Sequence, residues 1–438
     1  MLEHAPAPAR GISPLIPLGY LTCAAAAFLS AAAGIVWLAP DLAGHYYHPR
    51  VLALTHTVTL GWITLALMGA SYQLVPVVLE RPIWSESLAR WQLGVLAIAV
   101  VGMVAHFYLG TWPGLAWAAA LLSIGVTMHL VNIALSLGRS VSSTFTGRLI
   151  MGGYAGLALT TVFGLALAAN HLRPFLPGEF FPTLHAHVHL ALLGWVSPMI
   201  LGVAARVYPM FFLAPAPRPW ITRVQLWGLG IGVPSVVAGL LGGRALLPVG
   251  VVAAAAALLT HASWVIRMVH GRRRPALDWG LRFTLTGTAF VLPATGLGLA
   301  LAADVVSGPR VALVYAVVAL GGWISLTIVG MMLKIVPFLV WYRVYSPRAG
   351  RERVPTLIQL SSPMLEGWSY ALLSGGVLLL GVSVLKGDAG LIRIAGVIFS
   401  LGALAFAGAL ALILSHLRVR PRPVPPRVSL RHQEDHAQ

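Results

Sequence analysis

Twelve long apolar segments separated by short polar loops dominate this sequence of 438 residues. A helix needs about 20 mostly apolar residues to cross a bilayer, and each segment is long enough. Charged residues make up only 9% of the chain, against about 25% in a typical soluble domain. The pattern predicts an all-α polytopic membrane protein and excludes a cytosolic enzyme, a disordered chain and a nucleic-acid-binding domain. The predicted segments are 14–38, 51–79, 91–110, 113–137, 148–170, 184–208, 224–242, 246–268, 279–303, 311–340, 367–386 and 391–416.

The basic residues predict how these segments are oriented. If both termini are cytoplasmic, the outer loops hold six of the 29 Lys and Arg residues, whereas nearly all the others fall in inner loops and tails. An excess of basic residues on short inner loops is the positive-inside signal of membrane proteins. We therefore expect a multi-pass protein of a bacterial inner membrane, with the loops around Asp41, Glu179 and Asp304 outside. The six outer basic residues are Arg50, Arg173, Arg244, Arg310, Lys386 and Arg393.

No soluble domain or long linker interrupts the apolar segments, so residues 1–417 are expected to form one transmembrane domain. Residues 418–438 are rich in Pro and Arg and are expected to form a basic cytoplasmic tail beside the lipid bilayer. The single cysteine, Cys23, excludes an intrachain disulfide, an iron–sulfur cluster and covalent attachment of haem through a cysteine pair.

Three segments share a pattern in which a Gly-Trp pair is followed by a glycine, a long polar residue and a proline. The matching residues are Gly61-Trp62, Gly69, Gln73 and Pro76; Gly194-Trp195, Gly202, Arg206 and Pro209; and Gly322-Trp323, Gly330, Lys334 and Pro337. Each interval between the tryptophans contains four segments, so the chain is expected to consist of three pseudo-symmetric four-helix units. These units are approximately 14–137, 148–268 and 279–416.

Each part of this pattern has a physical interpretation. The glycines allow neighbouring helices to approach closely. The long polar residue lies near the cytoplasmic end and can extend toward lipid headgroups. The proline is expected to end the helix. The pattern therefore informs the fold and says little about chemistry.

Histidines lie at matching depths in two of the repeated segments. His56 and His189 each stand six residues before the tryptophan of the pattern. His185 shares a helix face with His189, whereas His187 is about 200° around the helix from either. An ionisable residue within a membrane marks a functional site by default, and neutral imidazole is the commonest metal ligand in proteins. This set is therefore a candidate site for haem or metal.

Two kinds of site fit these histidines. A haem with two axial ligands needs one on each side of its plane, and His56 with one histidine of the sixth segment can supply them. We expect that partner to be His189, with His185 able to replace it. His185 and His189 lie on one helix face and cannot supply both. Alternatively, they could hold one copper or zinc ion with a third ligand. His187, on the other face, is a further candidate metal ligand.

Histidines elsewhere in the chain are weaker candidates. His45 and His48 lie in an outer loop that is a further candidate metal site, although its tyrosines are also typical of a membrane interface. Three others lie late in their segments and are expected to interact with terminal carbonyls of their helices. These are His129, His261 and His416.

The twelve segments, the threefold pattern and the His185-Ala-His187-Val-His189 stretch leading to Trp195 resemble the largest subunit of the haem–copper oxidase superfamily. The likeness is closest to the branch of cbb-type oxidases and nitric oxide reductases. A group of haem- and copper-containing membrane proteins of nitrosative stress is a second, less similar family. The resemblance implies a haem ligand at His56 and a copper ligand among the sixth-segment histidines.

The sequence departs from that family at two places. The family carries paired histidines at the start of its seventh helix, where the segment from Gln225 has none. Its tenth helix supplies a His-x-His pair, where this chain has Tyr315-Ala-Val317. The resemblance therefore implies the scaffold without the oxygen-reducing centre, and no Asp or Glu lies in the centre of a segment to relay protons.

The leading hypothesis is a haem-binding membrane subunit that carries haem b. It would transfer electrons, or support other membrane or cytochrome subunits of a respiratory complex, without reducing oxygen itself. One alternative is a membrane protein that handles or transports copper or haem through its histidine cluster. Another is a structural scaffold subunit.

Overall fold

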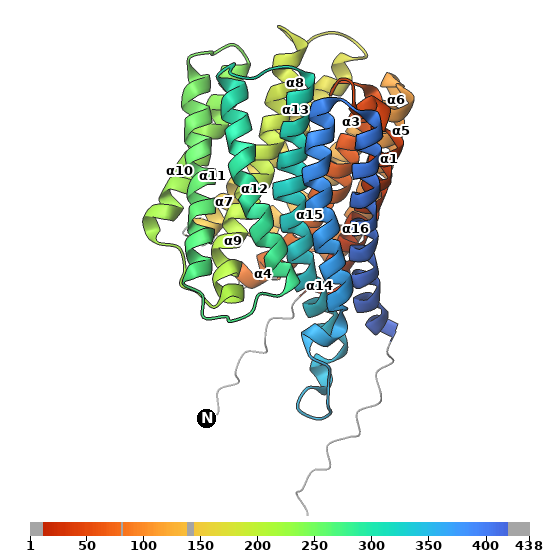
Figure 1. Cartoon of the computed structure of the whole chain (residues 1–438), viewed down its shortest axis with the longest axis vertical. Helices are drawn as coiled ribbons and strands as arrows, with labels where there is room; N and C mark the ends of the chain where they lie inside the picture. Colours follow the sequence, from red (N-terminus) through yellow and green to blue (C-terminus); the bar gives the residue numbers. More distant parts are fainter. Residues whose placement is uncertain (1–11, 80–81, 138–143, 419–438) are drawn as a thin grey trace, which may run out of the picture.

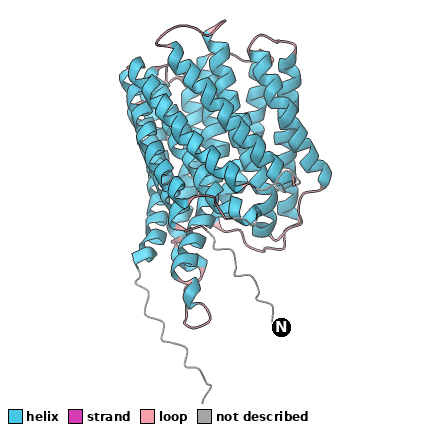
Figure 2. Ribbon diagram, turned by 180° about the vertical axis from the view of Figure 1, so that it is seen from behind, coloured by secondary structure: helices cyan, strands magenta, loops and turns pink. Residues whose placement is uncertain are grey.

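The structure is a computed structural model that describes residues 12–79, 82–137 and 144–418, so the predicted tail beyond residue 418 lies outside it. Within these residues, twelve helical spans are long and apolar enough to cross a membrane. They run side by side in one upright bundle (Figure 1), and the described part of the chain contains no strand (Figure 2). The prediction of an all-α polytopic membrane protein is therefore confirmed.

Nine spans are single α-helices, most of which match the predicted segments within a few residues. They are α1 (Leu15–Trp37), α5 (Glu86–Leu109), α6 (Trp112–Ser136), α7 (Phe145–Asn170), α10 (Pro219–Leu240), α11 (Leu246–His270), α12 (Trp279–Ala302), α15 (Pro363–Lys386) and α16 (Ala389–Ser415). Short elements connect or extend them: α2 (Ala39–Leu42), η5 (Ser346–Arg348), η6 (Leu357–Leu360) and η7 (His416–Arg418).

The other three spans are the ones that carry the Gly-Trp pattern, and each contains a π-helix between two α-helices. They are α3 (Pro49–His56), η1 (Thr57–Thr64) and α4 (Leu65–Leu79); α8 (Phe180–His189), η3 (Leu190–Val196) and α9 (Ser197–Phe212); and α13 (Pro309–Ala316), η4 (Val317–Ser325) and α14 (Leu326–Val344). A π-helix is rare and often marks a functional site. Its recurrence at one place in the pattern is consistent with three equivalent units.

Side chains stabilise these π-helices from within. The pattern tryptophans Trp62, Trp195 and Trp323 are almost completely buried. Two residues after the second and third of them, the Oγ atoms of Ser197 and Ser325 donate hydrogen bonds to the carbonyls five residues earlier, at 2.7 and 2.6 Å. A hydroxyl bonded in this way satisfies a carbonyl that the wider helical turn has freed.

The pattern glycines allow close helix contact, as predicted. A Cβ on Gly61 would lie 2.8 Å from the Cβ of Ala27 on α1, and a Cβ on Gly69 would lie 2.6 Å from the Cβ of Tyr20. A side chain on Gly330 would collide with the backbone of Gly280 on α12. Small residues therefore fix the distances between the pattern spans and their neighbours.

Two expectations about the cytoplasmic ends of these spans are wrong. Helices α4, α9 and α14 continue through Pro76, Pro209 and Pro337, because in membrane spans neighbouring groups can satisfy the backbone that a proline frees. Lys334 does not extend to lipid: its Nζ forms an ion pair with Oδ2 of Asp278, 2.6 Å away, at the N-cap of α12.

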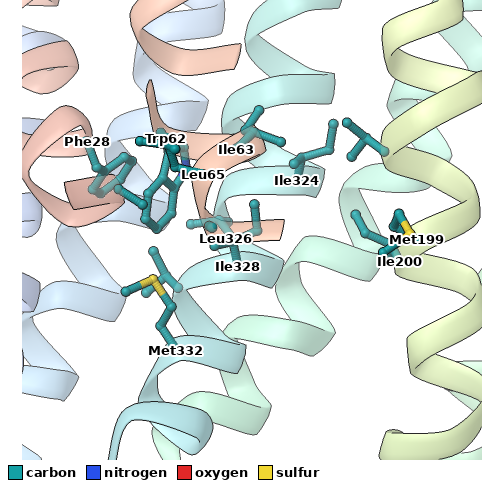
Figure 3. Packing of buried hydrophobic residues seen from close by; sticks show 14 of the residues in the cluster. Phe28, Trp62, Ile63, Leu65, Met199, Ile200, Ile324, Leu326, Ile328 and Met332 are labelled. Carbon is teal, nitrogen blue, oxygen red and sulfur yellow. The ribbon is translucent and has the colours of Figure 1, made fainter. Parts of the chain in front are cut away.

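The core lies where the pattern spans meet. The ring of Trp62 packs against Phe28 of α1, with centroids 4.5 Å apart, and residues of α14 such as Leu326 lie beside it (Figure 3). Large apolar side chains on the periphery, such as Trp91 and Trp117, remain exposed. This inside-out distribution is expected of a bundle whose surface contacts lipid.

The late-helix histidines differ from the expectation. His129 is fully buried, neither of its ring nitrogens has a hydrogen-bond partner among the described residues, and its ring meets Tyr72 edge to face. His261 is also buried, and its Nδ1 has no such partner. His416 bonds from Nδ1 to the hydroxyl of Tyr345 at 2.6 Å. Side chains from other helices therefore surround these rings, and within the described part of the chain no helix-terminal carbonyl is seen to accept a hydrogen bond from them.

Candidate functional site

A cavity of about 840 Å³ opens in the half of the bundle that contains α3, α8 and α13, whose labels lie toward one end in Figure 1. This volume is within the range of about 300–1,000 Å³ that is usual for small-molecule and cofactor pockets. Most of the wall is aliphatic, and histidines and tyrosines supply much of its polar part. The loops after α2, α7 and α12 border the same cavity, so they share one side of the membrane.

Five of the six histidines predicted from the sequence line this cavity. His56 ends α3, and His185, His187 and His189 lie along α8; His45 lies in the loop between α2 and α3. His48 is not among the lining residues. Its half-exposed ring points to Asp41, with 3.5 Å between Nδ1 and Oδ1.

Three of the lining histidines are held in the same way through Nδ1. This atom lies 2.7 Å from the carbonyl of Leu52 in His56, 2.8 Å from that of His185 in His189, and 3.1 Å from that of Thr160 in His187. A carbonyl only accepts hydrogen bonds, so Nδ1 must carry the proton in each ring. In a neutral ring the lone pair then lies on Nε2, as it does in metal-ligating histidines whose second nitrogen is fixed by a carbonyl.

The π-helices begin immediately after two of these rings. His56 is the last residue of α3 before η1, and His189 is the last residue of α8 before η3. Each ring bonds to a carbonyl of the regular turn before it. The wider turn that follows brings in the buried tryptophan of the pattern, so the motif that shapes the fold also sets the depth of the histidines.

The His56 and His189 rings are contacted by different neighbouring helices. The His56 ring stacks on Phe107 of α5, with centroids 4.5 Å apart and planes 23° apart. The His189 ring lies parallel to Tyr315 of α13, with centroids 6.3 Å apart. A phenol and an imidazole therefore share this part of the cavity.

Polar side chains form a rim at the end of the cavity that lies next to the loops after α2 and α7. The hydroxyl of Tyr46 lies 3.2 Å from Nε2 of His185, and that of Tyr47 lies 3.2 Å from Nε2 of His171. The His171 ring stacks on Trp112, with centroids 4.2 Å apart. Burial lowers the pKa of His171 and raises the pKa of Tyr47 to about 12, so both groups are neutral near pH 7.

The histidines of α8 do not converge on one point. His185 and His189 lie on one face and His187 bonds to α7 on the other, and His45 packs on Tyr46 at the rim. Among residues 12–79, 82–137 and 144–418 there is no group of three or more His, Cys, Asp or Glu placed to hold a single metal ion.

Sequence reasoning missed several residues that shape the site. The histidines and Tyr315 stood out, but their supports Phe107 and Thr160 did not, because each is an ordinary residue of an apolar helix. Tyr46 and Tyr47 were interpreted as interfacial, whereas they bond to histidines at the rim. The Thr160-Thr161 pair was the one available signal on α7, since hydroxyls are sparse in that segment.

No protein-family model matches the chain. The chain is similar to quinol oxidase subunit 1 of Sulfolobus acidocaldarius, with 24% identity over 198 residues. The alignment covers 41% of this chain and spans 38% of the length of that relative. This distant similarity supports a relationship to subunit I of the haem–copper oxidases, and it does not distinguish between branches of that superfamily.

Proposed function

We propose that this protein is a haem-binding membrane subunit that holds a b-type haem without a covalent link in the cavity, with His56 as one ligand. The observation that carries the proposal is the set of cavity-lining rings whose Nδ1 protons are fixed by carbonyls. His56, His187 and His189 all line the cavity, and the carbonyl bonded to each Nδ1 leaves the ring's lone pair on Nε2. An imidazole oriented by a second hydrogen bond is the usual axial ligand arrangement.

The cavity fits such a group in size and chemistry. It is mostly apolar, as a porphyrin requires, and its volume of about 840 Å³ is large for a site that would hold only a metal ion. When bound, haem b supplies one-electron chemistry at its iron. The protein's own residues would orient the ligands, exclude water and keep both faces of the ring apolar.

The proposed role is electron transfer, or support of other membrane or cytochrome subunits in a respiratory complex of a bacterial inner membrane. The chain has no histidine at Tyr315 or Val317, or in α10 near Gln225, where the oxidase family assembles its oxygen-reducing centre. It is therefore not proposed as an oxygen reductase. The relative's name makes a quinol one reductant to test.

Haem and metal analysis of the purified protein tests this proposal. Conversion of the bound pigment to its pyridine haemochromogen should identify haem b, and elemental analysis should find iron at a matching amount. Copper without haem would instead support a metal-handling protein that uses His185 and His189. A preparation with neither would support a structural scaffold.

A further inference from the structure

We infer that His187 is the residue of α8 that completes a two-histidine ligand pair with His56, and that His189 faces a separate part of the cavity. The inference rests on the proposed haem-binding function and assigns its second ligand. It reverses the expectation that His189, the residue equivalent to His56 in the repeat, is the partner.

The two α8 rings face opposite sides of their helix. Residues two apart on an α-helix are about 200° apart, so His187 and His189 cannot point into the same space. Helix α8 packs against α7 on one side and α10 on the other. His187 bonds to Thr160 of α7, whereas His189 lies parallel to Tyr315 of α13.

The cavity is lined by residues from both sides of α8, and we call these two groups of lining residues lobes. The α5–α7 lobe is the part lined by Met103, Phe107, Leu115, Leu122 and Thr160. The α10–α12 lobe is the part lined by Val236, Leu247, Val251, Ala294 and Gly298.

His56 and His187 belong to the α5–α7 lobe. Helix α3 packs on α5, and the His56 ring stacks on Phe107 of that helix. Helices α5, α6, α7 and α8 pack against one another in that order, so the helices that carry Phe107 and His187 belong to one continuous wall. His56 also lies near enough to His187 to interact with it electrostatically. Two rings from two helices therefore face one apolar space.

The local packing also leaves room for His187. A Cβ added to Gly164 of α7 would lie 3.0 Å from Cε1 of the His187 ring, so any larger residue there would push against that ring. The carbonyl of Thr160, one turn away on the same helix, holds Nδ1. Helix α7 thus fixes both the position and the tautomer of His187.

Spectroscopy of single variants of the full-length protein tests the pair. His56→Ala and His187→Ala should each lose the spectrum of a six-coordinate low-spin haem, measured by magnetic circular dichroism and low-temperature electron paramagnetic resonance. His189→Ala should retain it. His187→Met should remain low-spin with an altered spectrum, because a thioether can replace an axial imidazole. His48→Ala, which removes a half-exposed ring that does not line the cavity, is the matched control.

A second variant separates ligation from folding. Gly164→Val should displace the His187 ring without removing a ligand, and titration with haemin should show affinity weakened by about tenfold or more, the scale expected when a ligand's support is lost. If His189→Ala loses the low-spin spectrum while His187→Ala and Gly164→Val retain it, the inference is wrong and the proposed function stands. Low-spin haem that survives every one of these changes also overturns the inference. A wild-type protein that binds no haem overturns the proposed function itself.

Discussion

The indole Nε1 of Trp62 donates a hydrogen bond to Oγ of Ser325, 3.0 Å away, and so joins the π-helix η1 to the π-helix η4. Both residues are buried, and Ser325 also donates to the carbonyl of Leu320. The serine therefore satisfies a buried indole and a freed backbone carbonyl at once. This contact links the first and third repeats of the pattern directly below the cavity.

Ser325→Ala should destabilise the protein by about 1–3 kcal/mol, because it leaves a buried donor and a buried carbonyl unsatisfied. Reversible unfolding in mixed micelles measures this loss. Ser197→Ala is the matched control, since Ser197 donates to the carbonyl of Leu192 but Trp195 Nε1 has no partner among the described residues. Equal losses in the two variants would show that the Trp62 bond adds nothing.

Asp278→Asn should destabilise the end of the bundle at which α12 begins. Oδ2 of Asp278 accepts from Lys334 at 2.6 Å and from Arg274 at 3.0 Å, and Oδ1 caps α12 by accepting from the Leu281 amide at 3.1 Å. The asparagine side chain can still cap α12 but carries no charge, so the stability lost in this variant measures the contribution of the ion pairs. Lys334→Met should be milder, because an apolar side chain suits the bundle and Asp278 keeps Arg274. Melting temperatures in detergent compare the two, and a harmless Asp278→Asn would contradict this account.

The partly buried His171 ring in the rim predicts that the stability of the folded protein depends on pH. Burial lowers the pKa of His171, so below about pH 6.5, the ordinary value, the unfolded chain binds a proton that the folded rim does not. Stability contributed by the neutral ring is therefore present above that pH and is lost as the pH falls. The drop in melting temperature between pH 7.5 and pH 5.5 should be smaller in His171→Gln than in the wild type. An identical drop would show that His171 does not titrate in this way.

The fold was largely predictable because hydropathy alone locates membrane spans. The apolar runs gave all twelve spans, and the Gly-Trp pattern identified the three that form the core. What the pattern could not reveal is that each of these spans contains a π-helix. Such a turn is favoured only when side chains such as Trp62 and Ser325 meet across the bundle, and that requires the tertiary structure.

The depth of the site histidines was predictable from the sequence, whereas the directions in which their rings point were less so. The repeat placed His56 and His189 at equivalent positions, and both line the cavity. Equivalence in the repeat does not mean that two rings face each other, because each faces the neighbours of its own unit. The contacts of His187 with Thr160 and of His189 with Tyr315 come from helices distant in sequence, and no local pattern announces them.

The predicted orientation has a direct test. A reporter that is active only in the periplasm should be active when fused after Pro49 or Leu176. A reporter that is active only in the cytoplasm should be active when fused after Arg273, because the basic residues gather on the inner loops. The loops that border the cavity share one side in the structure, so the first two fusions must agree. If these two fusions disagree, the arrangement of the helices in the structure is wrong. If all three fusions show the opposite orientation, the cavity lies at the inner leaflet.

The reduced-minus-oxidised absorption spectrum of the purified protein, recorded beside that of His56→Ala, tests the central claim most directly. We predict a Soret band and the sharp α-band of a low-spin b-type haem in the wild type, and loss of that α-band in the variant. A wild type without a Soret band, or a variant with the same spectrum as the wild type, would contradict the claim that His56 holds haem in this cavity.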